Sequence, residues 1–133
     1  MNEIPAALEE RIAASADRLG ELAVAVRGSD SPPGLCLSLS GSLDGNNSHM
    51  FRELAEAALG AARGGDALIL DLAGLEYISS TGVGAFTTLL AEARRRETYL
   101  FVRGIQERVK AVFDILGFSE FFSFLEADEP GKP

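Results

Sequence analysis

One stretch of the chain decides the predicted fold: residues 67–85, which read ALILDLAGLEYISSTGVGA. It opens with an apolar run that only Asp71 interrupts, and such a run is typical of a central strand buried on both faces. Three hydroxyl residues stand at 79–81, and from Val83 apolar residues recur with helical spacing. The stretch therefore predicts a strand over 67–72 and a helix over 79–97, joined by a hydroxyl-rich loop.

The segments on either side continue the alternation of strands and helices. Residues 35–43 largely alternate leucine with small residues, which is the period of a half-buried strand, and Cys36 falls on the polar face. The apolar run 22–26 precedes it and suggests an antiparallel hairpin with a turn over 28–34. Helical spacing further predicts helices over 4–19, from Phe51 to a stop at Gly64, and over 105–116, with strands over 99–102 and 121–125. This order predicts a single α/β domain whose sheet is largely parallel.

Three parts are expected along the chain. An amphipathic helix occupies 1–19 and ends at Gly20, the domain proper occupies 20–127, and a flexible polar tail occupies 128–133. The N-terminal helix either covers part of the core or contacts a second copy or another partner, and the sequence leaves both open.

Charge and composition exclude several classes of function. The chain has 133 residues, a formal net charge of -8 and a pI of about 4.6. This charge does not suit nucleic acid or an anionic membrane, since both require basic residues. Cys36 and His49 are the only residues of their types, which excludes an internal disulfide and a Cys/His zinc cluster. With no membrane-length apolar run and no signal core, we expect a cytoplasmic protein without membrane insertion.

Catalytic and cofactor motifs are weak along the whole sequence. His49 could serve a Ser-His-Asp arrangement, but no G-x-S-x-G elbow is present, and a surface histidine is the favoured interpretation. Gly82-Val83-Gly84 opens a helix after a strand, as a dinucleotide loop does, but Thr87 occupies the place of the third glycine. Acids near strand ends could bind a metal, although capping and bracing suit them better: Asp44, Asp71 and Glu76. We therefore expect no enzyme activity, no cofactor and no metal.

The hydroxyl cluster Ser79-Ser80-Thr81 has a structural and a regulatory interpretation. One hydroxyl can cap the following helix by accepting from its free N–H groups. Gly82 and Gly84 are poor helix formers that leave the helix start bare, so another protein could approach closely. A phosphoryl group on a remaining hydroxyl would add about -1.5 to -2 of charge to a smooth, uncharged surface and would disrupt a partner interface.

Three motifs in this order resemble those of the STAS domain family. Residues 70–85 resemble the family's strand, short linker and Asp-Ser-Ser/Thr-Gly-Leu-Gly signature, with Ser79 in the place of the aspartate. Residues 41–44, Gly-Ser-Leu-Asp, resemble the Gly-x-Leu-Asp after its early strand, and 109–118 resemble its third main helix with the Gly-aliphatic pair that ends it. The resemblance spans 20–127 and implies a small mixed, mostly parallel sheet with helices mainly on one face, to which this chain adds an N-terminal helix.

The resemblance also implies a function for the hydroxyl cluster. Bacterial anti-sigma factor antagonists of this family bind an anti-sigma factor that is also a serine/threonine kinase, and phosphorylation at the helix start switches them off. Carried onto this sequence, the acceptor is Thr81, and Ser80 is the second choice. The residues that would contact the partner are Asp44, Ser79, Gly82, Val83 and Gly84. Because Ser79 replaces the usual acid, the alternative is a STAS interaction module that is not phosphorylated, in a signalling scaffold or a transport complex. A weak homodimer is also left open.

Overall fold

The computed structural model describes residues 4–62 and 65–125, so the predicted tail over 128–133 lies outside the described residues. Five strands and four α-helices alternate over these residues in the predicted order. The elements are α1 (Ala6–Ser15), the 3₁₀ turn η1 (Ala16–Leu19), β1 (Leu22–Asp30), β2 (Pro33–Leu43), α2 (Ser48–Ala61), β3 (Ala67–Ile78), α3 (Ser80–Arg95), β4 (Tyr99–Arg103), α4 (Glu107–Ile115), η2 (Ser119–Phe121) and β5 (Ser123–Leu125). The predicted α/β fold class is therefore confirmed.

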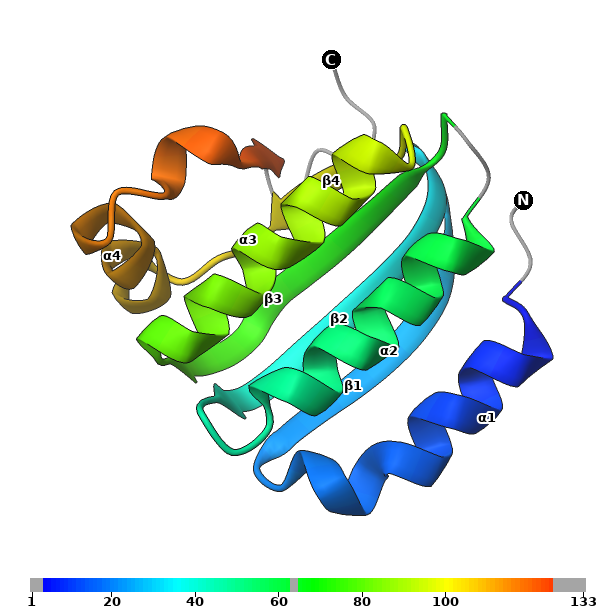
Figure 1. Cartoon of the computed structure of the whole chain (residues 1–133), viewed down its shortest axis with the longest axis horizontal. Helices are drawn as coiled ribbons and strands as arrows, with labels where there is room; N and C mark the ends of the chain where they lie inside the picture. The colour runs from blue at the N-terminus through cyan, green and yellow to red at the C-terminus, as the bar shows by residue number, and fades with distance from the viewer. Residues whose placement is uncertain (1–3, 63–64, 126–133) are drawn as a thin grey trace.

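The strands form one mixed sheet in the order β1-β2-β3-β4-β5. β1 and β2 make an antiparallel hairpin, and every later pair is parallel. In Figure 1, α2 and α3 lie in front of the sheet on one face, α1 lies along its outer edge at β1, and α4 lies beside α3. Because parallel strands need crossover connections, α2 and α3 each carry the chain back to start the next strand.

The hairpin is longer than the sequence predicted. Pairing continues through the expected turn residues to Asp30 opposite Pro33, which leaves only Ser31 and Pro32 in the loop. Backbone pairing does not depend on apolar side chains, so the polar composition of 28–30 concealed these strand residues.

β3 is also longer than predicted, because it runs to Ile78 rather than ending at Leu72. Ser38 and Ser40 of β2 pair with Asp71 and Gly74, so the interval contains an extra residue on β3, and a second register shift follows between Gly41 and Ser42. Such bulges bend and twist a strand. They bring the end of β3 to the position from which α3 begins.

The main core lies between the sheet and the four helices. Phe86 of α3 is at its centre, with ring centroids 5.4 Å from Phe51 of α2 and 5.5 Å from Phe113 of α4. All three rings are fully buried, and burial of such a side chain contributes about 1.5–3 kcal/mol. This cluster fixes α3 against its neighbours and therefore fixes the place of the helix start.

The N-terminal helix covers part of this core. Leu8 and Ile12 of α1 and Leu19 of η1 are buried in the same cluster. Figure 1 shows α1 along the outer side of β1, the first strand of the sheet. A helix in this position shields a strand edge that could otherwise pair with another chain.

The helix-free face of the sheet corrects one expectation. Cys36, placed on the polar face of a half-buried strand, is fully buried with Ala67 and Ile69 in a second, smaller cluster. Burial raises the pKa of the Cys36 thiol above its usual value. Cys36 alternates with leucines among small polar residues of β2, so β2 alone does not reveal the cluster. The other two buried members, Ala67 and Ile69, come from β3.

Candidate functional site

The start of α3 is anchored to the end of β2. The backbone N–H of Ser79 donates to the carbonyl of Leu43 at 2.9 Å, and Ser79 Oγ accepts from the backbone N–H of Gly82 at 3.1 Å. Ser79 is thus the N-cap of α3. The prediction that one of the three hydroxyls caps this helix is confirmed, and the capping hydroxyl belongs to the residue that stands in place of the family's aspartate.

Gly82 and Val83 form the buried side of this helix start. A Cβ atom on Gly82 would lie 2.7 Å from Ile78 Cγ1 and 3.1 Å from the carbonyl oxygen of Leu43. Only glycine therefore allows α3 to pack this closely on the end of β2. The side chain of Val83 is 0% exposed and belongs to the main core. The structure places both residues, which the sequence assigned to a partner surface, beneath that surface.

Ser80, Thr81 and Gly84 form the exposed side of the same helix start. Both hydroxyl residues are exposed, and neither hydroxyl has a hydrogen-bond partner within residues 4–62 and 65–125. Gly84 faces open space, because no atom lies within 4 Å of where its Cβ would be. Both candidate acceptors are therefore accessible. The two glycines differ sharply, because Gly84 is accessible and Gly82 is packed.

The loop before α2 is held by a residue that the sequence did not single out. Asn47 is buried; its Oδ1 accepts from the backbone N–H of Asp44, and its Nδ2 donates to the carbonyls of Leu19 and Ser42, all at 2.9 Å. The predicted contact residue Asp44 is partly exposed, and its side chain accepts from the backbone N–H of Asn46. Asn47 thus ties η1, β2 and α2 together beside the strand end that anchors Ser79. Tertiary contacts alone identify Asn47 as the buried asparagine of this loop.

Thr81 and Gly84 also line an open groove between α2 and α3. The groove has a volume of about 460 Å³, and its other lining residues are Gly45, Ser48, His49, Arg52, Ala85 and Thr88. Asp44 does not line this groove; it borders a separate hollow with Asn47 and Tyr77. Of the predicted site residues, Thr81 and Gly84 therefore line one hollow and Asp44 lines another.

The catalytic alternatives find no support in the geometry. His49 Nε2 lies 2.8 Å from Glu53 Oε2 on the exposed side of α2, in an ion-pair geometry rather than beside a serine nucleophile. Asp71 accepts from the backbone N–H of Ala73 and lies 3.6 Å from Arg27 of β1, so it braces β3 at its bulge. Within the described part of the chain, no three metal-ligating side chains come together.

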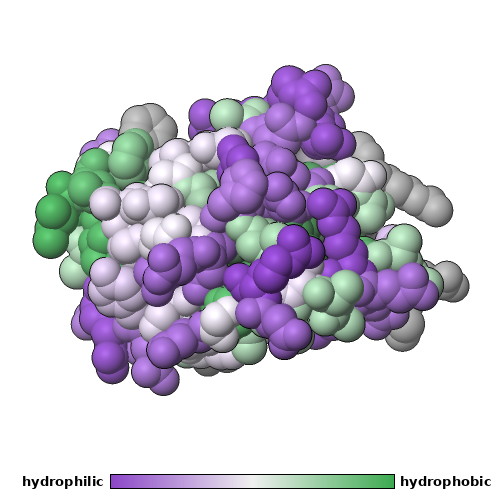
Figure 2. Space-filling view, turned by 60° about the horizontal axis from the view of Figure 1, so that its bottom comes forward, coloured by the Kyte–Doolittle hydropathy of each residue, from purple (hydrophilic) through white to green (hydrophobic). Residues whose placement is uncertain are grey.

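A second surface feature lies at the end of α4. Ile115 is 82% exposed, and Leu116 beside it is 38% exposed. Figure 2 shows a strongly hydrophobic area at the left end of the molecule, the end at which Figure 1 places α4. Gly117, at φ +78°, ends this helix as predicted, since the N–H of Phe118 donates to the carbonyl of Phe113.

Comparison with known proteins gives this fold a family. The family model described as the STAS domain matches residues 23–129, which is most of the chain. The chain belongs to the STAS domain family. The resemblance in its three motifs is thereby confirmed, and α1 precedes the matched region as the extra helix that the sequence predicted.

The relatives of this STAS chain include anti-sigma factor antagonists. One from Staphylococcus epidermidis, an anti-sigma-B factor antagonist, is 32% identical over 60 residues, which cover 45% of this chain and 56% of that protein. The match thus spans little more than half of the relative's length.

Solved structures share the fold. SpoIIAA of Bacillus, an anti-sigma factor antagonist, has a TM-score of 0.60 in its unphosphorylated form, with 19% identity over 80% of this chain and 91% of that one. Its phosphorylated form gives 0.59. A sulfate transporter family protein from Wolinella succinogenes gives 0.56, with 18% identity over 70% of this chain and 77% of that one. At these identities the likeness shows the fold alone. None of the helices within 4–62 and 65–125 has the length and hydrophobicity that crossing a membrane requires.

Proposed function

We propose that this STAS protein is an anti-sigma factor antagonist that binds an anti-sigma factor of the serine/threonine kinase type and is switched off by phosphorylation. The observation that carries the proposal is the exposed pair Ser80 and Thr81 on the first turn of α3, above a rigidly packed base. The anti-sigma factor antagonists among its relatives support the choice of partner.

The physics of the switch follows from the surface around the two hydroxyls. Ser79 and Gly84 carry no charge, and Gly84 faces open space, so a partner can press its backbone against this helix start. A phosphoryl group adds about -1.5 to -2 of charge and three acceptor oxygens, which a closely packed interface would have to desolvate. A tenfold loss of affinity requires only about 1.4 kcal/mol. The modification therefore releases the partner without any change of fold.

The replacement of the family's aspartate by Ser79 fits this mechanism. Ser79 caps α3 through a 3.1 Å hydrogen bond, and serine and aspartate are about equally good N-caps. The geometry of the acceptor hydroxyls is thus retained without the acid. What the substitution removes is one negative charge beside them, which makes the unmodified surface more neutral.

The acceptor is proposed to be Thr81, with Ser80 as the second choice. The test is incubation of the protein with ATP and the kinase-type anti-sigma factor from its own organism, followed by residue-level mass spectrometry. Thr81→Ala and Ser80→Ala separate the two hydroxyls, and the double variant is the control that should take up no phosphate. A wild-type protein that stays unmodified at both positions would contradict the switch.

A second function is favoured by the apolar pair Ile115–Leu116, which lies on α4 and involves no hydroxyl. In that case the chain is a STAS interaction module that docks through α4 and is not phosphorylated, in a scaffold or a transport complex. Ile115→Ser would then abolish capture of the partner, whereas Thr81→Glu would leave capture intact. The antagonist predicts a clear loss with Thr81→Glu.

A further inference from the structure

We propose that Arg52 of α2 binds the phosphoryl group once Thr81 is phosphorylated, so that the modified hydroxyl is held in the groove between α2 and α3. This inference rests on the proposed function, since it deepens the account of the same switch. It assigns a role to a residue outside the family's signature stretch and outside every predicted site.

No acidic residue lines the groove, although the protein as a whole is acidic. The chain has 20 acidic and 12 basic residues, yet no aspartate or glutamate is among the residues that line the groove. The lining residues that can carry charge are Arg52 and His49, both from α2. The remaining residues are glycine, alanine, serine and threonine, which leave room for a tetrahedral group. The groove is therefore suited to an anion.

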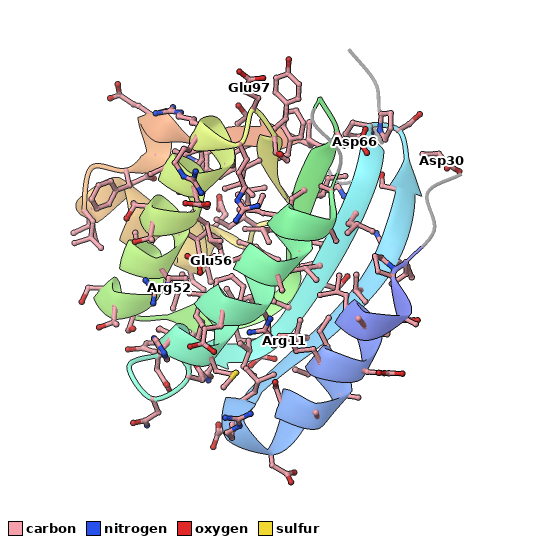
Figure 3. The ribbon with its side chains drawn as sticks, turned by 45° about the vertical axis from the view of Figure 1, so that its right-hand side comes forward. Arg11, Asp30, Arg52, Glu56, Asp66 and Glu97 are labelled. Atoms are coloured by element: carbon pink, nitrogen blue, oxygen red, sulfur yellow. The ribbon has the colours of Figure 1, made fainter. Side chains whose placement is uncertain are left out.

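Arg52 is positioned toward this groove without a carboxylate partner. Its Nη2 lies 3.3 Å from His49 Nδ1, and His49 Nε2 lies 2.8 Å from Glu53 Oε2. The histidine tautomer that satisfies both contacts donates from Nε2 to Glu53 and accepts at Nδ1 from Arg52. No ion pair joins Arg52 to an acid in the described part of the chain. Figure 3 shows Arg52 at the side of α2 that faces α3.

The free donors of Arg52 match the chemistry of a phosphoryl group. A guanidinium has five N–H donors, and a single contact to His49 leaves enough of them for a bidentate pair with phosphate oxygens. Lysine lacks this planar fork and would be a weaker substitute. Thr81 lines the groove, whereas Ser80 does not. The pairing is therefore specific to a phosphoryl group on Thr81.

The test uses phosphothreonine that is installed at position 81 during translation, so that no kinase is needed. The second pKa of the phosphoryl group is then measured by phosphorus NMR titration in the wild type and in Arg52→Gln. We expect the wild-type value to lie below the usual value of about 6 and to rise by about 0.5–1 unit in Arg52→Gln, because a nearby cation favours the dianion. The second pKa of the phosphoryl group in Arg52→Lys should lie between the values for the wild type and Arg52→Gln.

Three controls make the result specific. Arg94→Gln removes an exposed arginine in the last turn of α3 and should leave the phosphothreonine pKa unchanged. Phosphoserine installed at Ser80 should respond little to Arg52→Gln. His49→Gln removes the histidine that lines the groove beside Arg52. A phosphothreonine pKa that stays low in this variant is then due to Arg52.

Equal pKa values in Arg52→Gln and Arg94→Gln would overturn the inference. That outcome is distinguishable from failure of the proposed function, because a kinase that ignores Thr81 leaves this titration unaffected. Conversely, phosphorylation that releases the partner from Arg52→Gln as well as from the wild type would support the proposed function and show that the switch does not need Arg52.

Discussion

The two sides of the start of α3 differ in almost every physical respect, although they alternate along the same six residues. The buried side consists of Ser79, Gly82 and Val83, together with Asn47 in the loop below, and each is held by a cap bond, a close approach, core packing or buried hydrogen bonds. The exposed side consists of Ser80 and Thr81, whose side chains are exposed, and Gly84, which faces open space. A packed base and an accessible chemical group therefore come from one helical turn. Substitutions on the buried side should therefore change stability, and substitutions on the exposed side should change binding.

The largest effect is expected from Asn47→Ala on the buried side. The substitution leaves the carbonyls of Leu19 and Ser42 and the N–H of Asp44 without their partner. At roughly 1 kcal/mol or more for each lost hydrogen bond, the free energy of unfolding should fall by about 3 kcal/mol. Urea denaturation measures it, and Asn46→Ala is the matched control, because the exposed Asn46 side chain should matter by less than about 0.5 kcal/mol. Similar midpoints for the two variants would contradict the role of Asn47.

The two glycines offer the most direct contrast between the sides. Gly82→Ala places a methyl group against Ile78 and the carbonyl of Leu43, and overpacking of this kind costs about 1–3 kcal/mol. Gly84→Ala meets open space, so the better helix propensity of alanine should stabilise the protein by up to about 1 kcal/mol. Thermal unfolding of both variants measures the opposite signs. Two shifts of the same sign would show that the glycines are not divided between a packed and a bare side.

A smaller effect is expected at the helix cap. Ser79→Ala removes the acceptor of the Gly82 N–H and should cost about 1 kcal/mol, whereas Ser79→Asp should be nearly neutral because aspartate caps equally well. The same urea experiment ranks the two variants. If Ser79→Asp destabilised as much as Ser79→Ala, capping would not explain why serine can replace the family's acid.

The sequence predicted the exposed side better than the buried side, for physical reasons. Helical spacing and the glycine pair located the start of α3, and a cap within Ser79–Thr81 followed from the helix N-terminus. Which hydroxyl caps, and that Gly82 approaches Leu43, depend on how β2 and α3 pack, and the spacing of residues along one chain segment does not contain this contact. The assignment of Gly82 and Val83 to partner contact stays a prediction, and their burial likewise depends on how α3 packs.

Other parts of the fold were hidden for related reasons. The bulges that extend β3 to Ile78 arise from its register with β2, and Ala73-Gly74 looks like a break when it is viewed alone. Cys36 is buried by residues of β3, whereas its small polar neighbours in β2 predicted that it lies on a polar face. The fold class was more accessible, because strand–helix alternation and three ordered motifs do not depend on such details.

The central claim is that the exposed side carries the signal while the buried side carries the structure. The most direct measurement is the affinity of the kinase-type anti-sigma factor for Thr81→Glu and Thr81→Ala, with Ser80→Glu and Ser80→Ala measured alongside, together with the thermal stability of each variant. We expect a glutamate at the acceptor position to weaken binding at least about tenfold and alanine there to preserve it, with stabilities within about 0.5 kcal/mol of the wild type. Equal affinities for the glutamate and alanine variants at both positions would contradict it.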